Sequence, residues 1–236
     1  FGILAMIVEA VYNFADKLHA RRIRIFFANK DIGFVVDVGA HKGEFIRLVV
    51  DKNVPVFVFE PQKSVHETLE SAISGHNVKG LHKSAVSDKT GEIELYVNSL
   101  SSTTSTLPPN EKSAWIRFKK AILGGHLVRR VEKVAVTTLD VSVGPAIGDL
   151  ARGLLKIDVE GHEGSVLAGA QALLASGRVE FVQIEKARYK IYEGPTQDPI
   201  ALLEKHGYRE CRQFLFPLLN FSDIIYRRTA TGTTDT

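Results

Sequence analysis

The sequence contains a single cysteine, Cys211, among its 236 residues. One thiol cannot form an intramolecular disulfide, and a structural zinc site built on several cysteines is excluded. The fold therefore depends on packing, and a reducing compartment such as the cytoplasm is the expected location.

Long apolar runs and a strong charge imbalance are also missing. The apolar stretch from Phe1 to Val8 ends at Glu9, well short of the roughly 18 residues that span a membrane. Lysine and arginine number 30 against 27 aspartates and glutamates, an excess too small for a dedicated nucleic-acid-binding protein. We therefore expect neither a membrane span nor a nucleic-acid partner.

The first 30 residues carry apolar side chains at helical spacing, followed by basic ones. The apolar positions are Leu4, Ile7, Val8, Val11, Phe14, Ala15 and Leu18. This pattern predicts an amphipathic N-terminal helix that packs on the main core or on a second copy of the chain, forming a homo-oligomer. Attachment to a membrane surface is the alternative.

Residues 31–228 alternate between short apolar runs and helical patterns, which predicts one α/β domain, followed by a flexible tail over residues 229–236. Continuous apolar runs are typical of parallel strands covered by helices on both faces. The runs are Phe34–Val38, Val54–Phe59, Val78–Ser84, Leu154–Val159 and Val179–Glu185. A closing antiparallel hairpin is predicted from Tyr208–Phe216 and Asp223–Arg228.

Three sequence signals predict helices between these strands. The sequence Ser64-Val65-His66-Glu67 has the spacing of a capping box. Apolar residues from Val166 to Leu174 predict one continuous helix. Asp198 followed by Pro199 predicts a helix start, and Gly207 predicts its end.

An insertion separates two alternating segments, Gly91–Val97 and Val131–Thr137, which predict antiparallel strands at the margin of the sheet. The residues between them, 98–130, have no regular pattern, and so long a connection is usually functional. We expect a lid over the acceptor site. Its basic residues and Trp115 would favour an anionic acceptor, whereas a solvated surface loop is the alternative.

A glycine-containing turn, Asp37-Val38-Gly39-Ala40-His41-Lys42-Gly43, follows the first predicted strand and opens a helix. Ligands bind at such turns because backbone N–H groups are free there. Glu60 ends the second strand about 20 residues later, where an acidic residue accepts hydrogen bonds from ribose. A dinucleotide fingerprint would need glycine at Asp37, so NAD is disfavoured.

Two carboxylates suit S-adenosylmethionine, because Asp37 could hold its ammonium group and Glu60 its ribose. The alternative is that the glycines only shape a tight turn and that Glu60 is a surface charge.

A second polar cluster spans Leu154 to Glu163, at the end of a predicted strand. Asp158, and after it His162 or Glu160, could accept a proton from an acceptor hydroxyl. Alternatively, Asp158 bonds the neighbouring loop and the glutamates favour the positive end of the next helix. Metal binding by this cluster with Glu185 matches no known ligand spacing, so no metal is predicted.

The chain resembles the FkbM-type family of S-adenosylmethionine-dependent methyltransferases. The resemblance rests on Val36–Gly43, Phe59-Glu60-Pro61, Ala85–Asp88 followed by Gly91, Ser101-Ser102, Thr138-Leu139-Asp140, Leu155–Glu163 and Tyr192-Glu193-Gly194. It implies a class I methyltransferase (Rossmann-like) fold with seven mostly parallel strands, helices on both faces and an antiparallel closing hairpin.

The resemblance also implies cofactor contacts and a reaction. The cofactor residues would be Asp37, Gly39, Ala40, His41, Gly43 and Glu60, with Ser84 and Ala85 near the adenine. His41 replaces the asparagine often found in the family's turn. The implied reaction is O-methylation of a sugar, glycan or natural product.

Two other functions stay open: an RNA methyltransferase and a cofactor-binding scaffold without turnover. Base N-methylation often uses an Asn/Asp-Pro-Pro-aromatic tetrad, and Leu107-Pro108-Pro109-Asn110 has the wrong flanks. Cytosine C5 chemistry needs a cysteine nucleophile, whereas Cys211 lies in the predicted hairpin. Both observations favour an acceptor other than nucleic acid.

Overall fold

A computed structural model describes residues 15, 17–98, 104–113, 116–117, 128–187, 192, 197–216 and 221–229. Among these residues, the helices are all too short or too polar to cross a membrane.

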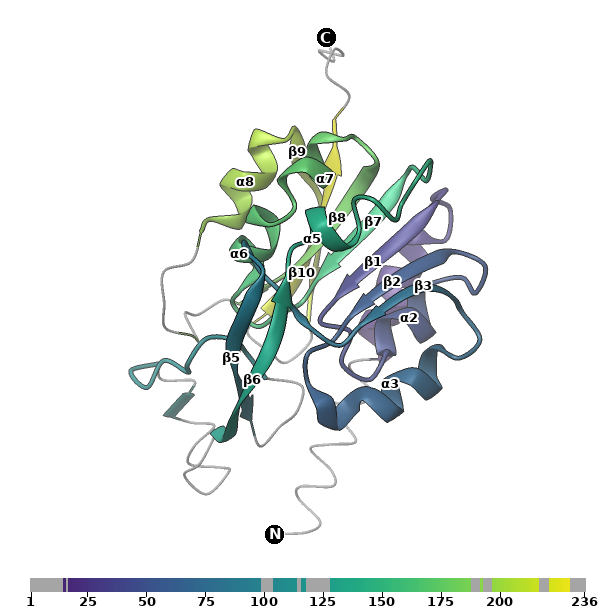
Figure 1. Ribbon diagram of the computed structural model, residues 1–236. Helices are drawn as coiled ribbons and strands as arrows, with labels where there is room; N and C mark the ends of the chain where they lie inside the picture. Colours follow the sequence, from purple (N-terminus) through teal and green to yellow (C-terminus); the bar gives the residue numbers. More distant parts are fainter. Residues whose placement is uncertain are drawn as a thin grey trace.

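The main sheet contains seven strands in the order β3-β2-β1-β7-β8-β10-β9 (Figure 1). Its neighbours are parallel except for β10, which lies antiparallel between β8 and β9. This arrangement confirms the predicted fold with its closing hairpin. The strands are β1 (Phe34–Val38), β2 (Pro55–Phe59), β3 (Asn77–His82), β7 (Gly153–Ile157), β8 (Val179–Ala187), β9 (Tyr208–Leu215) and β10 (Phe221–Arg228).

Two apolar layers cover the sheet, one on each face, because successive side chains of a strand point to opposite sides. Val36 and Val38 pack toward α5 (Leu139–Ser142), α6 (Glu163–Ala168), α7 (Gln171–Ala175) and α8 (Pro199–Lys205). Val35 packs toward α2 (Glu44–Val49), α3 (His66–Ile73) and the helix of residues 17–27. Burial on both faces explains why the strand sequences are continuously apolar.

The described part of the N-terminal helix packs on its own sheet. His19, Ile23 and Phe27 are buried at a four-residue spacing, so they share one face of the helix. The Phe27 ring lies edge-on to that of Phe181 in β8, with centroids 5.7 Å apart. A subunit contact through this helix stays a prediction.

A second sheet contains β4 (Ala85–Val86), β5 (Gly91–Asn98) and β6 (Val128–Thr137), in the order β4-β6-β5. Figure 1 shows β5 and β6 side by side, and within the described residues neither pairs with a strand of the main sheet. The prediction that β5 and β6 extend the margin of the main sheet is therefore wrong. Alternation indicates a half-exposed strand, but it does not say which sheet the strand joins.

The predicted helix from Val166 to Leu174 is divided into α6 and α7. Between them, an added Cβ on Gly169 would lie 2.0 Å from the Ser87 carbonyl oxygen. The Asp140 carboxylate accepts hydrogen bonds from the first turn of α7, which gives this helix its own start. The apolar face itself is buried as predicted.

The two predicted helix starts have different outcomes. Asp198 caps α8 by accepting a hydrogen bond from Ile200 N at 2.9 Å. The capping box at Ser64 is wrong, because Lys63–Val65 form a 3-10 turn and the Ser64 hydroxyl accepts a hydrogen bond from the Gln62 side chain instead.

Candidate cofactor and acceptor site

The turn after β1 approaches two neighbouring strands closely. Gly39 N and Ala40 N both donate to the carbonyl oxygen of Phe59, at 3.0 and 3.1 Å. Gly39 has φ +79°, and an added Cβ would lie 1.9 Å from the carbonyl oxygen of Asp158. Glycine is therefore required here by both the backbone angle and the space.

The second glycine of the turn packs against α3. Gly43 has φ +78°, and an added Cβ would lie 3.1–3.3 Å from three apolar side chains of that helix. Between the two glycines, His41 takes a positive φ of 49°. The whole turn is thus held between α3, the end of β2 and the end of β7.

Glu60 directly follows β2 and faces this turn. Its Oε2 accepts a hydrogen bond from His41 N at 2.8 Å, and its Oε1 accepts one from Gln62 N at 2.7 Å. Burial raises the pKa of Glu60, while these two N–H groups act to lower it. Each carboxylate oxygen keeps a further lone pair, so Glu60 can still accept from a ribose hydroxyl.

Asp37 is fully buried within β1 and faces Lys156 of β7. Its Oδ1 lies 3.1 Å from Lys156 Nζ. Neither of its carboxylate oxygens accepts a hydrogen bond within the described part of the chain, so the contact with Lys156 is an ion pair. Burial raises the pKa of Asp37 against the lowering effect of the Lys156 ammonium.

Lys156 was not among the site residues predicted from the sequence. The sequence does contain a signal that could have identified it, a lysine inside an otherwise apolar strand. A lysine buried in this way needs a partner of opposite charge. Burial disfavours its charged form, but the carboxylates of Asp37 and Asp158 outweigh burial and raise the pKa of Lys156.

Asp158 lies just beyond β7, next to the turn. Its backbone N–H donates to the carbonyl oxygen of Val38 at 3.0 Å, and its Oδ2 lies 3.3 Å from Lys156 Nζ. Its side chain is 40% exposed to solvent. A carboxylate of this kind can reach both the turn and a molecule bound beside it.

The other two candidate catalytic residues are held by side chains from distant parts of the chain. Tyr192 donates to Glu160 Oε2 at 2.6 Å, and Glu160 has a positive φ of 54°. His162 is buried with its Nε2 at 2.9 Å from Ser87 Oγ, and burial lowers its pKa. These contacts favour Asp158 over both as a proton acceptor.

Two further carboxylates lie near Asp158, and Glu163 stands in the first turn of α6, the position of the structural alternative given for it from the sequence. Its Oε1 accepts a hydrogen bond from Gly161 N at 3.0 Å, and burial raises the pKa of Glu163 to about 7. Glu185 in β8 lies opposite Asp223 of β10 in the strand register. Burial, together with the negative charges of neighbouring carboxylates, raises the pKa of Glu185 well above its ordinary value. Among the described residues, no three metal-binding side chains converge as ligands would.

Replacement of Glu163 by glutamine should remove a pH-dependent destabilisation. A carboxyl group whose pKa is raised to about 7 on folding holds its proton more tightly in the folded state, so stability falls as pH rises from about 4.5 to 7. We expect Glu163→Gln to raise the free energy of unfolding by about 1 to 3 kcal/mol at pH 8, and by much less at pH 4.5. Urea unfolding at both pH values measures this, and an equal change at both would contradict it.

Ser84 and Ala85 lie differently from the prediction. The third strand ends at His82, whose carbonyl oxygen accepts from Glu60 N at 3.0 Å. Ser84 follows that strand, and Ala85 begins β4 and pairs with Val136 of the second sheet. Placing these two residues at the end of the third strand is therefore wrong, and a contact with adenine stays a prediction.

The described part of the insertion lies against the candidate acceptor side. Ser105 exchanges two backbone hydrogen bonds with Tyr96 of β5, and its hydroxyl donates to the carbonyl oxygen of Glu160 at 2.8 Å. Pro109 forms a β-bridge with Tyr192. The lid stays a prediction, since Trp115, Lys119 and Lys120 lie outside the described residues.

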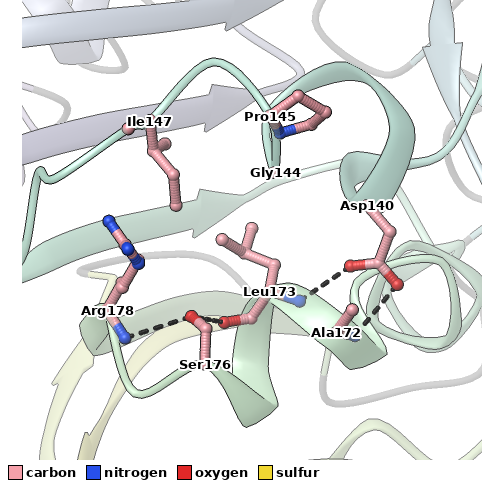
Figure 2. A pocket seen from close by; sticks show the side chains of 9 residues that line it. Asp140, Gly144, Pro145, Ile147, Ala172, Leu173, Ser176 and Arg178 are labelled. Atoms are coloured by element: carbon pink, nitrogen blue, oxygen red, sulfur yellow. Dashed lines mark hydrogen bonds between the residues drawn. The ribbon is translucent and has the colours of Figure 1, made fainter.

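A separate pocket of about 440 Å³ opens at the other end of the sheet, before β7 and β8 begin. Figure 2 shows Asp140 pointing at the backbone of Ala172 and Leu173, to which it is hydrogen-bonded. Arg178 donates to the carbonyl oxygen of Leu150 at 3.3 Å. Both charged side chains therefore stabilise the local backbone. In sheets of this type, ligands bind at the opposite end, beyond the carboxyl ends of the strands.

A family model, the methyltransferase FkbM domain, matches residues 37–210. The chain belongs to the FkbM methyltransferase family. The match includes the β1 turn, Glu60 and the strand end at Asp158, and it confirms the resemblance seen in the sequence. A search of curated protein sequences returned no match.

Several solved structures are similar to this chain at low sequence identity. Magnesium protoporphyrin IX methyltransferase from Synechocystis, solved with S-adenosylmethionine, is 11% identical, with 97% of this chain and 85% of that one covered and a TM-score of 0.46. The methyltransferase domain of bacterial CtHen1-C is 12% identical, with 92% and 100% covered and a TM-score of 0.47. These likenesses carry no further argument, and the assignment rests on the family match and the strand order.

Glu60→Ala should weaken binding of S-adenosylhomocysteine by about 1.5 to 3 kcal/mol, the range for hydrogen bonds to a charged group. The reason is that Glu60 is fixed by two backbone N–H groups and faces the turn. Calorimetry measures the affinity, and Glu67→Ala, at an exposed position on α3, is the matched control. Unchanged affinity in Glu60→Ala would remove this residue from the ribose role.

Proposed function

We propose that this protein transfers a methyl group from S-adenosylmethionine to a hydroxyl group of a sugar, glycan or natural product. The observation that carries the proposal is the position of Asp158, a partly exposed carboxylate beside the glycine turn. A carboxylate there could accept the hydroxyl proton as the acceptor oxygen takes the methyl group, while the bond between the methyl carbon and sulfur breaks and S-adenosylhomocysteine leaves.

The residues around the turn fit this methyl donor. The buried Asp37 Oδ2, which accepts no hydrogen bond from the described residues, suits an ammonium group. Glu60 suits the ribose hydroxyls, and Gly39 allows close approach of the backbone. When bound, S-adenosylmethionine supplies an electrophilic methyl group, and the protein supplies alignment and a base.

The charge of the acceptor is a separate part of the proposal. An anionic acceptor is suggested by the basic insertion, in which Lys112 and Arg117 are exposed. The carboxylates at the strand ends, Asp158, Glu160 and Glu185, instead favour an uncharged polyol. Fractionation of the labelled product by anion exchange decides between the two.

Transfer of an isotopic methyl group from S-adenosylmethionine into fractionated cell extract tests the function. We expect label in a glycan or small-molecule fraction, and labelling slowed by about 10² to 10⁴ with Asp158→Asn. Label that is released by ribonuclease would indicate RNA methylation instead. Cofactor binding with no labelled fraction would indicate a scaffold without turnover.

A further inference from the structure

The ammonium group of Lys156 makes three contacts inside the protein. Its Nζ lies 2.9 Å from the carbonyl oxygen of Gly39, 3.1 Å from Asp37 Oδ1 and 3.3 Å from Asp158 Oδ2. The contact with Gly39 is a hydrogen bond, and the other two are ion pairs with carboxylates. Only 6% of the residue is exposed, so the ammonium group faces these three partners inside the protein and not the solvent.

The contact with Asp37 controls the charge of a buried carboxylate. Asp37 is fully buried, and the negative charges of Asp158, just beyond β7, and Glu44 in α2 both favour its protonated form. Lys156 is the cation that opposes them. Loss of Lys156 would leave burial and these two charges unopposed, which favours the protonated form of Asp37, and that form cannot pair with an ammonium group.

The contact with Gly39 controls the direction of a peptide group. The hydrogen bond to the Gly39 carbonyl oxygen holds the Gly39–Ala40 peptide against β7, while Ala40 N of the same peptide donates to the carbonyl oxygen of Phe59 in β2 at 3.1 Å. The Gly39 peptide is therefore fixed from both sides. Its neighbours in the turn are the groups that would face the methyl donor.

We infer that Lys156 is a positioning residue for the amino-acid end of the methyl donor. It keeps Asp37 as a carboxylate and fixes the Gly39 peptide, and it does not touch the donor itself. The inference rests on the proposed function only in taking S-adenosylmethionine as the donor.

Two ligands that differ at this end test the inference. S-adenosylhomocysteine carries the amino-acid end, whereas 5′-methylthioadenosine carries only the adenosine and a methylthio group. By calorimetry, we expect Lys156→Met to weaken the binding of S-adenosylhomocysteine by about tenfold to a hundredfold. The binding of 5′-methylthioadenosine should weaken by less than about threefold. Lys79→Met, at an exposed position in β3, should change neither affinity.

Equal losses for both ligands, or no loss for either, would overturn the role of Lys156. Wild-type protein that binds neither ligand would instead contradict the proposed function. The two failures are therefore distinguishable, because the first is seen only when the wild type binds.

A second comparison covers the case in which Lys156→Met does not fold because it leaves Asp37 buried without a cation. The variant with both Asp37→Asn and Lys156→Met has no unpaired charge at this pair. Because part of the effect of Lys156 runs through Asp37, adding Lys156→Met to Asp37→Asn should weaken binding of S-adenosylhomocysteine by less than about tenfold further. A further loss of tenfold or more would overturn the inference.

Discussion

Asp158→Asn is expected to lower turnover by about 10² to 10⁴, the effect typical of losing a general base. Asparagine has nearly the same shape and can still accept a hydrogen bond from Lys156, which lies 3.3 Å away. The fold and the cofactor turn should therefore be preserved. The affinity for S-adenosylhomocysteine should change by less than about threefold, because the change removes a proton acceptor rather than a cofactor contact.

Initial rates on the labelled acceptor fraction, together with calorimetry, measure these two effects. Asp149→Asn, at an exposed position before β7, is the matched control and should leave both unchanged. Turnover of Asp158→Asn within a few-fold of wild type would move the role of base to another group. Glu185, His162 and Glu160 would then be the residues to replace.

Gly39→Ala is expected to lower the free energy of unfolding by about 3 to 5 kcal/mol, from overpacking combined with backbone strain. The added Cβ would lie 1.9 Å from the Asp158 carbonyl oxygen, and the backbone φ of +79° disfavours any side chain. The clash is with backbone, so relief requires the turn to move away from β7. Binding of S-adenosylhomocysteine should then be lost, because the turn and Asp37 no longer match the ligand.

Gly148→Ala separates strain from the clash. Gly148 also has a positive φ, +51°, but an added Cβ there meets nothing within 4 Å. In this control variant, the free energy of unfolding should fall by only about 1 kcal/mol, and the affinity for S-adenosylhomocysteine should not change. Urea unfolding and calorimetry on both variants decide the matter, and equal behaviour of the two would contradict a tight contact between the turn and β7.

The strands of the main sheet and the cofactor turn could be predicted because their signals are local. A run such as Phe34–Val38 is apolar on both faces, which already indicates a strand between two layers of helices. Gly39 and Gly43 stand where the chain needs positive φ, and Glu60 stands where β2 ends. Each of these signals lies within a few residues of the feature that it predicts.

The second sheet could not be placed from the sequence. Alternating residues in β5 show that one face of this strand is covered, but they do not show which strand it pairs with. In the structure β5 pairs with β6 in a separate sheet, and neither strand joins the main sheet. For the same reason, the break between α6 and α7 was missed. It depends on the approach of Gly169 to Ser87, which lies in a different part of the chain.

The sequence by itself determined the parallel sheet, the glycine turn and the carboxylates at the strand ends. Only the tertiary structure decided which partner each charged group has: Lys156 with Asp37 and Asp158, Tyr192 with Glu160, and Ser87 with His162. Backbone angles and apolar periodicity depend on neighbouring residues, and they can be read in order along the chain. The charge state of a buried group depends on burial and on residues far away in the sequence, so it exists only once the chain has folded.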